Sequence, residues 1–316
     1  MPIVRPAQAA AVPGRETDLE EFRRPLLAYC YRMLGSHHEA EDAVQETMIR
    51  AWRGLARLDG LGGLRAWMYK IATNVCLDTL GDRRGRALPM DLTTPAEASG
   101  ELGVPLVEST WVQPIPTRLV AGDDPLERAV SSESIRLAFV AALQFLLPRQ
   151  RAVLILRDVL CWRAAEVASL LDTSVDGVNS TLRRARAALA EARGADPARA
   201  GAEAVDPALL ARYVDAFERF DVDRIVALLR YDAVVSMPPY AFWLHGRDAF
   251  RDFLRAGRVG CEYRRGVATE ANGVPAVAMY GPSGQPSALH VLEWRAGRVA
   301  TLHAYLDPAL VPLFSP

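Results

Sequence analysis

The chain has 316 residues, half of them hydrophobic and about a quarter charged, which is typical of folded globular proteins and excludes a disordered chain. This length predicts two or three domains. A formal net charge of −1 argues against a uniformly basic nucleic-acid binder, but it leaves room for a local basic surface balanced by acidic residues elsewhere.

Cysteine spacing and hydropathy favour a reduced, cytoplasmic protein. The four cysteines are far apart and form no CxxC motif or Cys/His cluster, so neither a metal site nor a cofactor is expected. No apolar run approaches the length of a membrane-spanning helix, and the first residues do not resemble a signal peptide. We therefore expect no membrane partner.

Residues 1–17 are expected to be a flexible tail, and residues 18–93 a helical domain. Within it, residues 40–55 (AEDAVQETMIRAWRGL) are amphipathic. The pattern directs an apolar set inward, namely Ala43, Val44, Thr47, Met48, Ala51, Trp52 and Leu55. The outward set is Asp42, Gln45, Glu46, Ile49 and Arg50. An exposed isoleucine among charged residues indicates a surface for a protein partner.

A second amphipathic helix is predicted over residues 64–80. Its apolar face holds Leu64, Trp67, Met68, Ile71, Ala72, Val75, Cys76 and Thr79. The other face shows Tyr69, Lys70, Thr73 and Asn74, and Arg83, Arg84 and Arg86 follow the helix. Aromatic, amide and basic groups on one exposed face suit unstacked bases and a phosphate backbone. The alternative is an ordinary solvated helix face, which is the better interpretation for Tyr69 taken alone.

Residues 94–130 are predicted to be an acidic linker. The stretch 87–130 contains seven acidic and two basic residues, is rich in proline and glycine, and lacks a sustained helical period. Trp111, in the sequence TWVQPIP, is a candidate anchor for this otherwise flexible segment.

Residues 131–194 are again helical by periodicity. The stretch VASLLDTSVDGVNSTLRRARAAL (167–189) reads as a short helix, a turn and a longer helix, with Thr173 as the expected N-cap. The inward set is Val175, Val178, Leu182, Ala185 and Leu189; the outward set is Ser174, Asp176, Asn179, Ser180, Arg183, Arg184 and Arg186. Short polar side chains followed by arginines suit a DNA-reading helix-turn-helix. This stretch alone does not separate that motif from an ordinary helical hairpin.

A second linker is expected over residues 195–206, followed by a mixed domain over 207–316. It begins with a helix (ALLARYVDAFERFDVDRIVALL) and ends with strand-like runs such as ALHVLEW and RVATLHAYL. A candidate pocket gathers Trp243, His245, His290, His303, Tyr305 and Asp307. These groups are compatible with acid–base catalysis, with sensing of a small ligand, or with a packing role.

Four segments in order carry a family resemblance: EAEDAVQETMIRAW, LRAWMYKIATNVCLDTLGDRR, LPRQRAVLILRDVLCWRAAEVASLL and SVDGVNSTLRRARAAL. Residues 18–194 resemble bacterial sigma factors of the extracytoplasmic-function type, with a region 2 bundle and a region 4 helix-turn-helix. The resemblance implies that the 40–55 helix contacts the β′ clamp helices of RNA polymerase, and region 4 its β flap. Lys70 and Asn74 would hold the melted −10 element, and residues 174–187 would read the −35 element. Asp172 stands in the turn where the family often has glycine.

Residues 208–316 resemble the SnoaL-like branch of the NTF2 fold, in which helices precede a curved antiparallel sheet around a conical pocket. The sequence therefore predicts two all-α sigma domains followed by an α+β NTF2-like cone, as in the actinobacterial SigG- and SigJ-like subgroup. The expected function is promoter-specific initiation, with the last domain acting in cis and no enzymatic activity. An anti-sigma factor and a small ligand remain open. The rivals are a helix-turn-helix regulator that does not bind polymerase and a SnoaL-like cyclase or isomerase.

Overall fold

A computed structural model describes residues 19–55, 63–81, 85–121, 133–193, 205–257 and 262–315. They divide into two compact units. The first takes in residues up to 34, 38–83 and 148–185, and the second takes in 35–37, 84–147 and residues from 186 onward. The expected tail, Arg83, Arg84 and the linker residues 195–204 lie outside the described residues.

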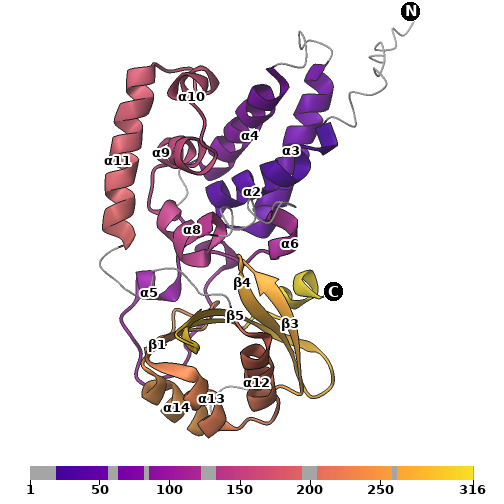
Figure 1. The fold of residues 1–316 in the computed structure, drawn as a ribbon, viewed down its shortest axis with the longest axis vertical. Helices are drawn as coiled ribbons and strands as arrows, with labels where there is room; N and C mark the ends of the chain where they lie inside the picture. Colours follow the sequence, from indigo (N-terminus) through magenta and orange to yellow (C-terminus); the bar gives the residue numbers. More distant parts are fainter. Residues whose placement is uncertain are drawn as a thin grey trace, which may run out of the picture. The chain divides into compact units, whose positions relative to one another are not determined.

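The first unit is a bundle of helices (Figure 1). Its elements are α2 (Arg23–Leu34), α3 (His37–Gly54) from residue 38, α4 (Leu64–Leu80), α9 (Pro148–Leu154), η4 (Ile155–Val159), α10 (Ala164–Leu170) and the part of α11 (Val175–Arg193) up to residue 185. Apolar residues at helical spacing form its interior, where Leu26, Met68 and Val178 are fully buried. Within the described residues, no helix combines the length and apolar character needed to span a bilayer.

The second unit contains a six-stranded sheet of order β2-β1-β6-β5-β4-β3. The strands are β1 (Leu229–Ser236), β2 (Trp243–His245), β3 (Arg265–Ala271), β4 (Val274–Tyr280), β5 (Pro286–Arg295) and β6 (Arg298–Tyr305). Five neighbouring pairs hold it together, and the β1–β6 pair is parallel while the other four are antiparallel. The expected antiparallel sheet is thus mixed, because the last strand, β6, lies beside the first strand, β1, and runs in the same direction.

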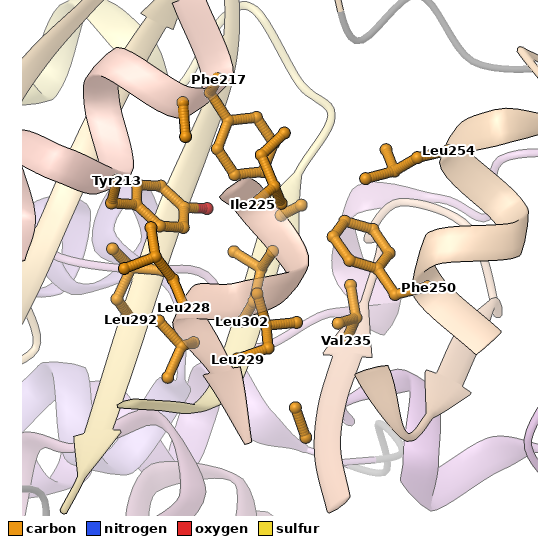
Figure 2. Packing of buried hydrophobic residues seen from close by; sticks show 14 of the residues in the cluster. Tyr213, Phe217, Ile225, Leu228, Leu229, Val235, Phe250, Leu254, Leu292 and Leu302 are labelled. Atoms are coloured by element: carbon orange, nitrogen blue, oxygen red, sulfur yellow. The ribbon is translucent and has the colours of Figure 1, made fainter. Parts of the chain in front are cut away.

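Helices α12 (Pro207–Glu218), α13 (Val222–Leu228) and α14 (Arg247–Arg255) lie against the sheet (Figure 1). Apolar side chains from these helices and from the strands meet in one cluster, which includes Tyr213, Phe217, Phe250, Leu292 and Leu302 (Figure 2). These packed side chains form the core of the C-terminal domain.

The single helix expected over residues 208–229 is two helices. Phe220 has a positive φ of 51°, which ends α12, and the Asp221 carboxylate then accepts a hydrogen bond from the Arg224 amide as the N-cap of α13. The apolar spacing continues across this break, so periodicity alone did not reveal it.

The predicted linker is largely ordered. Residues 85–121, which we call the strap, contain α5 (Pro89–Leu92), η3 (Glu108–Thr110) and α6 (Thr117–Val120), and they belong to the second unit together with α8 (Leu137–Gln144). Trp111, Val112 and Ile115 are buried, so the proposed anchor role of Trp111 is matched by its burial. The expectation of a flexible chain fails for this part; residues 122–132 lie outside the described residues.

Backbone hydrogen bonds fix the strap on the C-terminal domain. The Asn272 side chain accepts from the Ile115 amide at 2.9 Å, and the Asn272 amide donates back to the Ile115 carbonyl at 3.0 Å. The Tyr305 hydroxyl donates to the Val112 carbonyl at 2.8 Å. Because buried backbone groups need partners, these bonds allow an irregular segment to lie against a sheet.

Candidate nucleic-acid interface

The outward face of α3 is open to solvent. Asp42, Gln45, Ile49 and Arg50 are exposed, and Glu46 is half-buried. The Arg50 guanidinium lies 2.7 Å from the Glu46 carboxylate, one helical turn away. This face therefore presents charged groups around one exposed isoleucine, as the sequence predicted.

Trp52 contradicts the inward assignment of its helix. It is 57% exposed, whereas its neighbour Ala51 is fully buried. Position 52 lies at the edge of the apolar stripe, where the described bundle leaves more than half of the side chain in solvent. The exposed indole extends the exposed apolar part of this face beyond Ile49.

The polar face predicted for α4 is only partly exposed. Asn74 is exposed and Lys70 is half-buried, but Tyr69 and Thr73 are buried and belong to the core. The Thr73 hydroxyl forms a 2.8 Å hydrogen bond with the Tyr29 hydroxyl, which satisfies both groups inside the bundle. Placing Tyr69 and Thr73 on an open face was therefore wrong, because α2 and the region around Trp162 cover them.

The side of α4 that carries Arg65, Tyr69 and Lys70 lies against the helix-turn-helix region of the first unit. The Lys70 ammonium lies 2.9 Å from the Asp172 carboxylate in the turn after α10. The Tyr69 and Trp162 rings lie 5.1 Å apart, and the Arg65 guanidinium lies 5.1 Å from the Trp162 ring. The sequence analysis did not single out Arg65 or Trp162. The segment CWR between two predicted helices could have indicated Trp162, because a tryptophan is unusual in such a connection.

A buried arginine joins the same elements. Arg151 of α9 donates to the Met33 carbonyl at the end of α2, and burial lowers its pKa to about 10. Arg32 is also buried, donates to the Ala28 carbonyl at 2.9 Å, and has a pKa lowered to about 10 for the same reason. Both remain cations at neutral pH, and carbonyl oxygens supply the acceptors that water would otherwise provide.

The turn between α10 and α11 has the conformation that its sequence predicted. Asp172 has a φ of 51°, so the left-handed position often held by glycine tolerates this residue. The expected N-cap was wrong by one residue: α11 begins at Val175, and the Ser174 hydroxyl accepts a hydrogen bond from the Gly177 amide at 3.0 Å.

The outward face of α11 remains accessible. Asp176, Asn179, Arg183, Arg184 and Arg186 are exposed and Ser180 is half-buried, while Val178, Leu182 and Ala185 are buried. Val175, which was expected inside, is 43% exposed because it lies in the first turn, beyond the packed part of the helix. Short polar groups near the start and arginines further along thus share one open face, a geometry that fits a major groove.

Arg86 has a structural position instead of an exposed one. Its guanidinium donates to the carbonyls of Glu108 and Trp111, both at 2.9 Å, and the residue is buried. It therefore fixes the turn of the strap before TWVQPIP, a role that the run of arginines after α4 did not suggest.

The predicted C-terminal pocket residues do not converge. His303 and Tyr305 share one face of β6, with Trp243 in the same row across β1, and the His303 ring bonds the Ser236 hydroxyl at 2.7 Å. His290 pairs with Ala304 on the opposite face, among core aromatics, and its ring bonds the Tyr213 hydroxyl at 2.8 Å. Burial lowers the pKa of His290 to about 3, so it is neutral. His245 is exposed.

A cavity of about 270 Å³ lies between the strap and the C-terminal domain. We call it the strap pocket; it is lined by Leu106, Glu108, Trp111, Gln113, Pro238, Pro239, Tyr305, Leu306, Asp307 and Leu310. Of the six expected pocket residues, it contains Tyr305 and Asp307. Among the described residues, no group of three or more His, Cys, Asp and Glu side chains is placed to hold a metal ion.

Three families match successive parts of the chain. Residues 19–86 match Sigma-70 region 2, residues 136–189 match Sigma-70 region 4, and residues 210–302 match the SnoaL-like domain. The chain is similar to the ECF RNA polymerase sigma factor SigG of Mycobacterium tuberculosis, with 47% identity over 305 residues, 93% of this chain and 82% of that protein.

Two further likenesses involve SigJ of the same organism. The sequence is 31% identical to SigJ over 224 residues, covering 70% of this chain and 64% of that one. The SigJ crystal structure matches with a TM-score of 0.61 at 22% identity, covering 94% of this chain and 98% of the other. The structural likeness shows a shared fold.

Proposed function

We propose a division of labour among the domains of this chain, which belongs to the extracytoplasmic-function family of RNA polymerase sigma factors. The protein directs transcription initiation as a sigma factor. Its polymerase-binding, promoter-binding and controlling surfaces lie on different elements, and we place its site of action in the cytoplasm with the polymerase.

The α3 face is the proposed surface for core polymerase. Its exposed groups Asp42, Gln45 and Arg50 surround Ile49, and the exposed Trp52 extends the apolar part. Such a mixture of charge and isolated large apolar side chains suits a helix-to-helix contact with the β′ clamp. Phe145 and Leu147, at the end of α8, are 55% and 67% exposed and supply an apolar surface for the β flap.

Promoter recognition is assigned to α4 and α11. Asn179 and Arg183 on the open face of α11 would read the −35 element, and Lys70 and Asn74 of α4 would hold the melted −10 element. Since Lys70 is paired with Asp172 and Trp162 covers Tyr69, the described state is a closed one in which α4 is not free to take single-stranded DNA. Binding of polymerase would have to open it.

The C-terminal domain is proposed to restrain the sigma domains in cis without catalysis. It holds the strap, which follows region 2, through Asn272 and Tyr305. Its histidines serve packing: His290 bonds Tyr213 in the core and His303 bonds Ser236. The C-terminal domain can thus restrain the sigma domains in place of, or alongside, a separate anti-sigma factor. A small ligand would bind in the strap pocket.

One observation carries the proposal: the exposed residues of α11 and those of α3 form two distinct sets on two different helices. Arg183→Ala should reduce promoter-specific run-off transcription about tenfold, because a groove contact is worth roughly 1–3 kcal/mol, while association with core polymerase on gel filtration stays unchanged. Arg219→Ala, at an exposed ion pair in the C-terminal domain, is the matched control and should change neither.

Each rival predicts a different outcome. Loss of core association in Arg183→Ala would contradict the domain assignment. A helix-turn-helix regulator would bind duplex operator DNA specifically without polymerase, and core polymerase would give no added transcript. A SnoaL-like enzyme would show turnover that depends on His303 or Asp307, while sigma activity would be absent.

A further inference from the structure

We propose that the strap pocket is a binding site for a small organic cation with a flat apolar body and a hydrogen-bond acceptor. The pocket is part of the second unit, formed by strap residues such as Trp111 and by C-terminal residues such as Leu310. The binding part of this inference stands independently of the sigma function, and its regulatory consequence rests on that proposed function.

The charge of the pocket lining determines which sign of charge the ligand can carry. Glu108 and Asp307 contribute carboxylates, and none of the described lining residues is basic. An organic acid or a phosphate would therefore be repelled, whereas an ammonium group gains a charge-assisted hydrogen bond.

The walls of the pocket select an apolar body of limited size. Leu106, Trp111, Leu306 and Leu310 line it together with two consecutive prolines. A volume of about 270 Å³ lies just below the usual range of roughly 300–1,000 Å³ for ligand cavities, which favours a single-ring molecule. An indole wall adds attraction for a cation placed over its face.

A buried donor in the lining lacks a partner. The Trp111 side chain is only 3% exposed, and its Nε1–H has no hydrogen-bond acceptor within the described structure. Buried N–H groups are nearly always satisfied in folded proteins. A small rotation of the indole toward the pocket would let a ligand oxygen accept from Nε1–H, which adds a requirement for an acceptor to the requirement for a cation.

The remaining polar groups of the lining are held in place without a ligand. Gln113 donates to the Glu108 carboxylate at 2.6 Å, and the Asp307 carboxylate accepts from the Ala309 amide at 3.0 Å. The Tyr305 hydroxyl is committed to the Val112 carbonyl. A site whose groups are already fixed loses little conformational entropy on binding.

Occupancy would act on the strap. Because strap and domain both line the pocket, a ligand that contacts both binds only the docked state and shifts the population toward it. An organic cation would therefore strengthen the restraint on the sigma domains. Its removal would favour release of the strap.

Tyramine tests the binding site directly, because it combines an ammonium group, one ring and a phenolic oxygen. Two matched compounds isolate the charge: neutral tyrosol and anionic 3-(4-hydroxyphenyl)propionate. The readout is the indole N–H resonance of Trp111 in ¹H–¹⁵N spectra of the full chain, assigned by its loss in Trp111→Phe. We expect saturable shifts with tyramine, about tenfold weaker binding of tyrosol and no binding of the acid.

Variants locate the interaction. Asp307→Asn keeps the oxygen that accepts from Ala309, and Glu108→Gln keeps the shape of the side chain; each should weaken tyramine binding about fivefold or more. Asp223→Asn, an exposed carboxylate of the same domain paired with Arg255, should leave it unchanged. Equal binding of the acid, no loss in either pocket variant, or no Trp111 shift at roughly 5 mM tyramine would each overturn the proposal.

Run-off transcription with tyramine tests whether binding at the strap pocket also regulates transcription. Fewer transcripts from the full chain, with no effect in Asp307→Asn, would support control through the strap. Binding without any change in transcription would overturn the regulatory consequence and leave the site in place. A chain that binds tyramine but never supports transcription would instead count against the sigma function.

Discussion

At the scale of single residues, side-chain exposure follows the helical period where one face of a helix meets solvent. The outward residues of α3 and α11 are exposed, apart from the half-buried Glu46 and Ser180. The sequence-based expectation failed at Tyr69 and Thr73, because periodicity gives the direction of a side chain within its own helix and says nothing of which other elements cover it. Trp52 and Val175 failed in the opposite sense: each lies at the edge of an apolar stripe, and they are 57% and 43% exposed.

His290 gives the C-terminal domain a predictable response to acid. Its pKa is lowered to about 3 in the folded state, so the stability that it contributes is complete above its unfolded pKa of about 6.5 and is lost as pH falls from there toward 3. The unfolding free energy should therefore decrease by up to about 1.4 kcal/mol per pH unit from this residue alone.

Urea unfolding between about pH 7 and pH 5 measures this slope. His290→Gln should flatten it, and His245→Gln, at an exposed position of the same domain, should leave it unchanged. Burial raises the pKa of Glu293, which acts in the opposite direction, so the difference between variants is the readout. An equal slope in the wild type and in His290→Gln would refute a buried neutral imidazole.

Asp172 carries two separable effects, an ion pair and a backbone conformation. Asp172→Asn keeps a residue type that tolerates the left-handed region and removes only the exposed pair with Lys70, so it should cost less than about 1 kcal/mol. Asp172→Ala should cost roughly 1–2 kcal/mol more, because alanine has no local hydrogen bond to offset the positive φ. Denaturant unfolding of both variants compares them, and equal losses would show that the turn is not strained.

At the scale of elements, the helices of both sigma regions and the closing strands were predictable because their apolar periods are long. The break at Phe220 was not, since a positive φ leaves no mark on the apolar spacing. The order in the strap was not predictable either: its polar, proline-rich composition is typical of linkers, and its hydrogen bonds go to Asn272 and Tyr305, more than a hundred residues away.

Trp162 holds α4 under the helix-turn-helix, and its removal should open that contact. Trp162→Ala should cost about 3 kcal/mol or more and speed amide hydrogen exchange across residues 64–80, because the indole is only 6% exposed against Tyr69. Trp52→Ala is the matched control, with a change within about 0.5 kcal/mol and no faster exchange there. Equal exchange in both variants would show that Trp162 does not close this surface.

At the scale of the whole molecule, the order of two helical regions and a mixed domain follows from the order of motifs in the sequence. The division of the chain into two compact units does not follow from that order, because the strap packs with the C-terminal domain and residues 148–185 pack with region 2. Both assignments depend on contacts between segments far apart in the chain, such as Arg151 with Met33, that no local pattern specifies.

The most direct test is run-off transcription with core polymerase, comparing the full chain with variants that release the strap. Tyr305→Phe removes the hydroxyl that bonds Val112, and Asn272→Gly removes the side chain that bonds Ile115 while tolerating the positive φ of 54°. Tyr280→Phe, whose hydroxyl bonds Ser315 away from the strap, is the control. The account predicts core-dependent, promoter-specific transcripts that increase severalfold in the two strap variants and stay constant in the control. No transcript from any chain, or fewer transcripts from the strap variants, would contradict it.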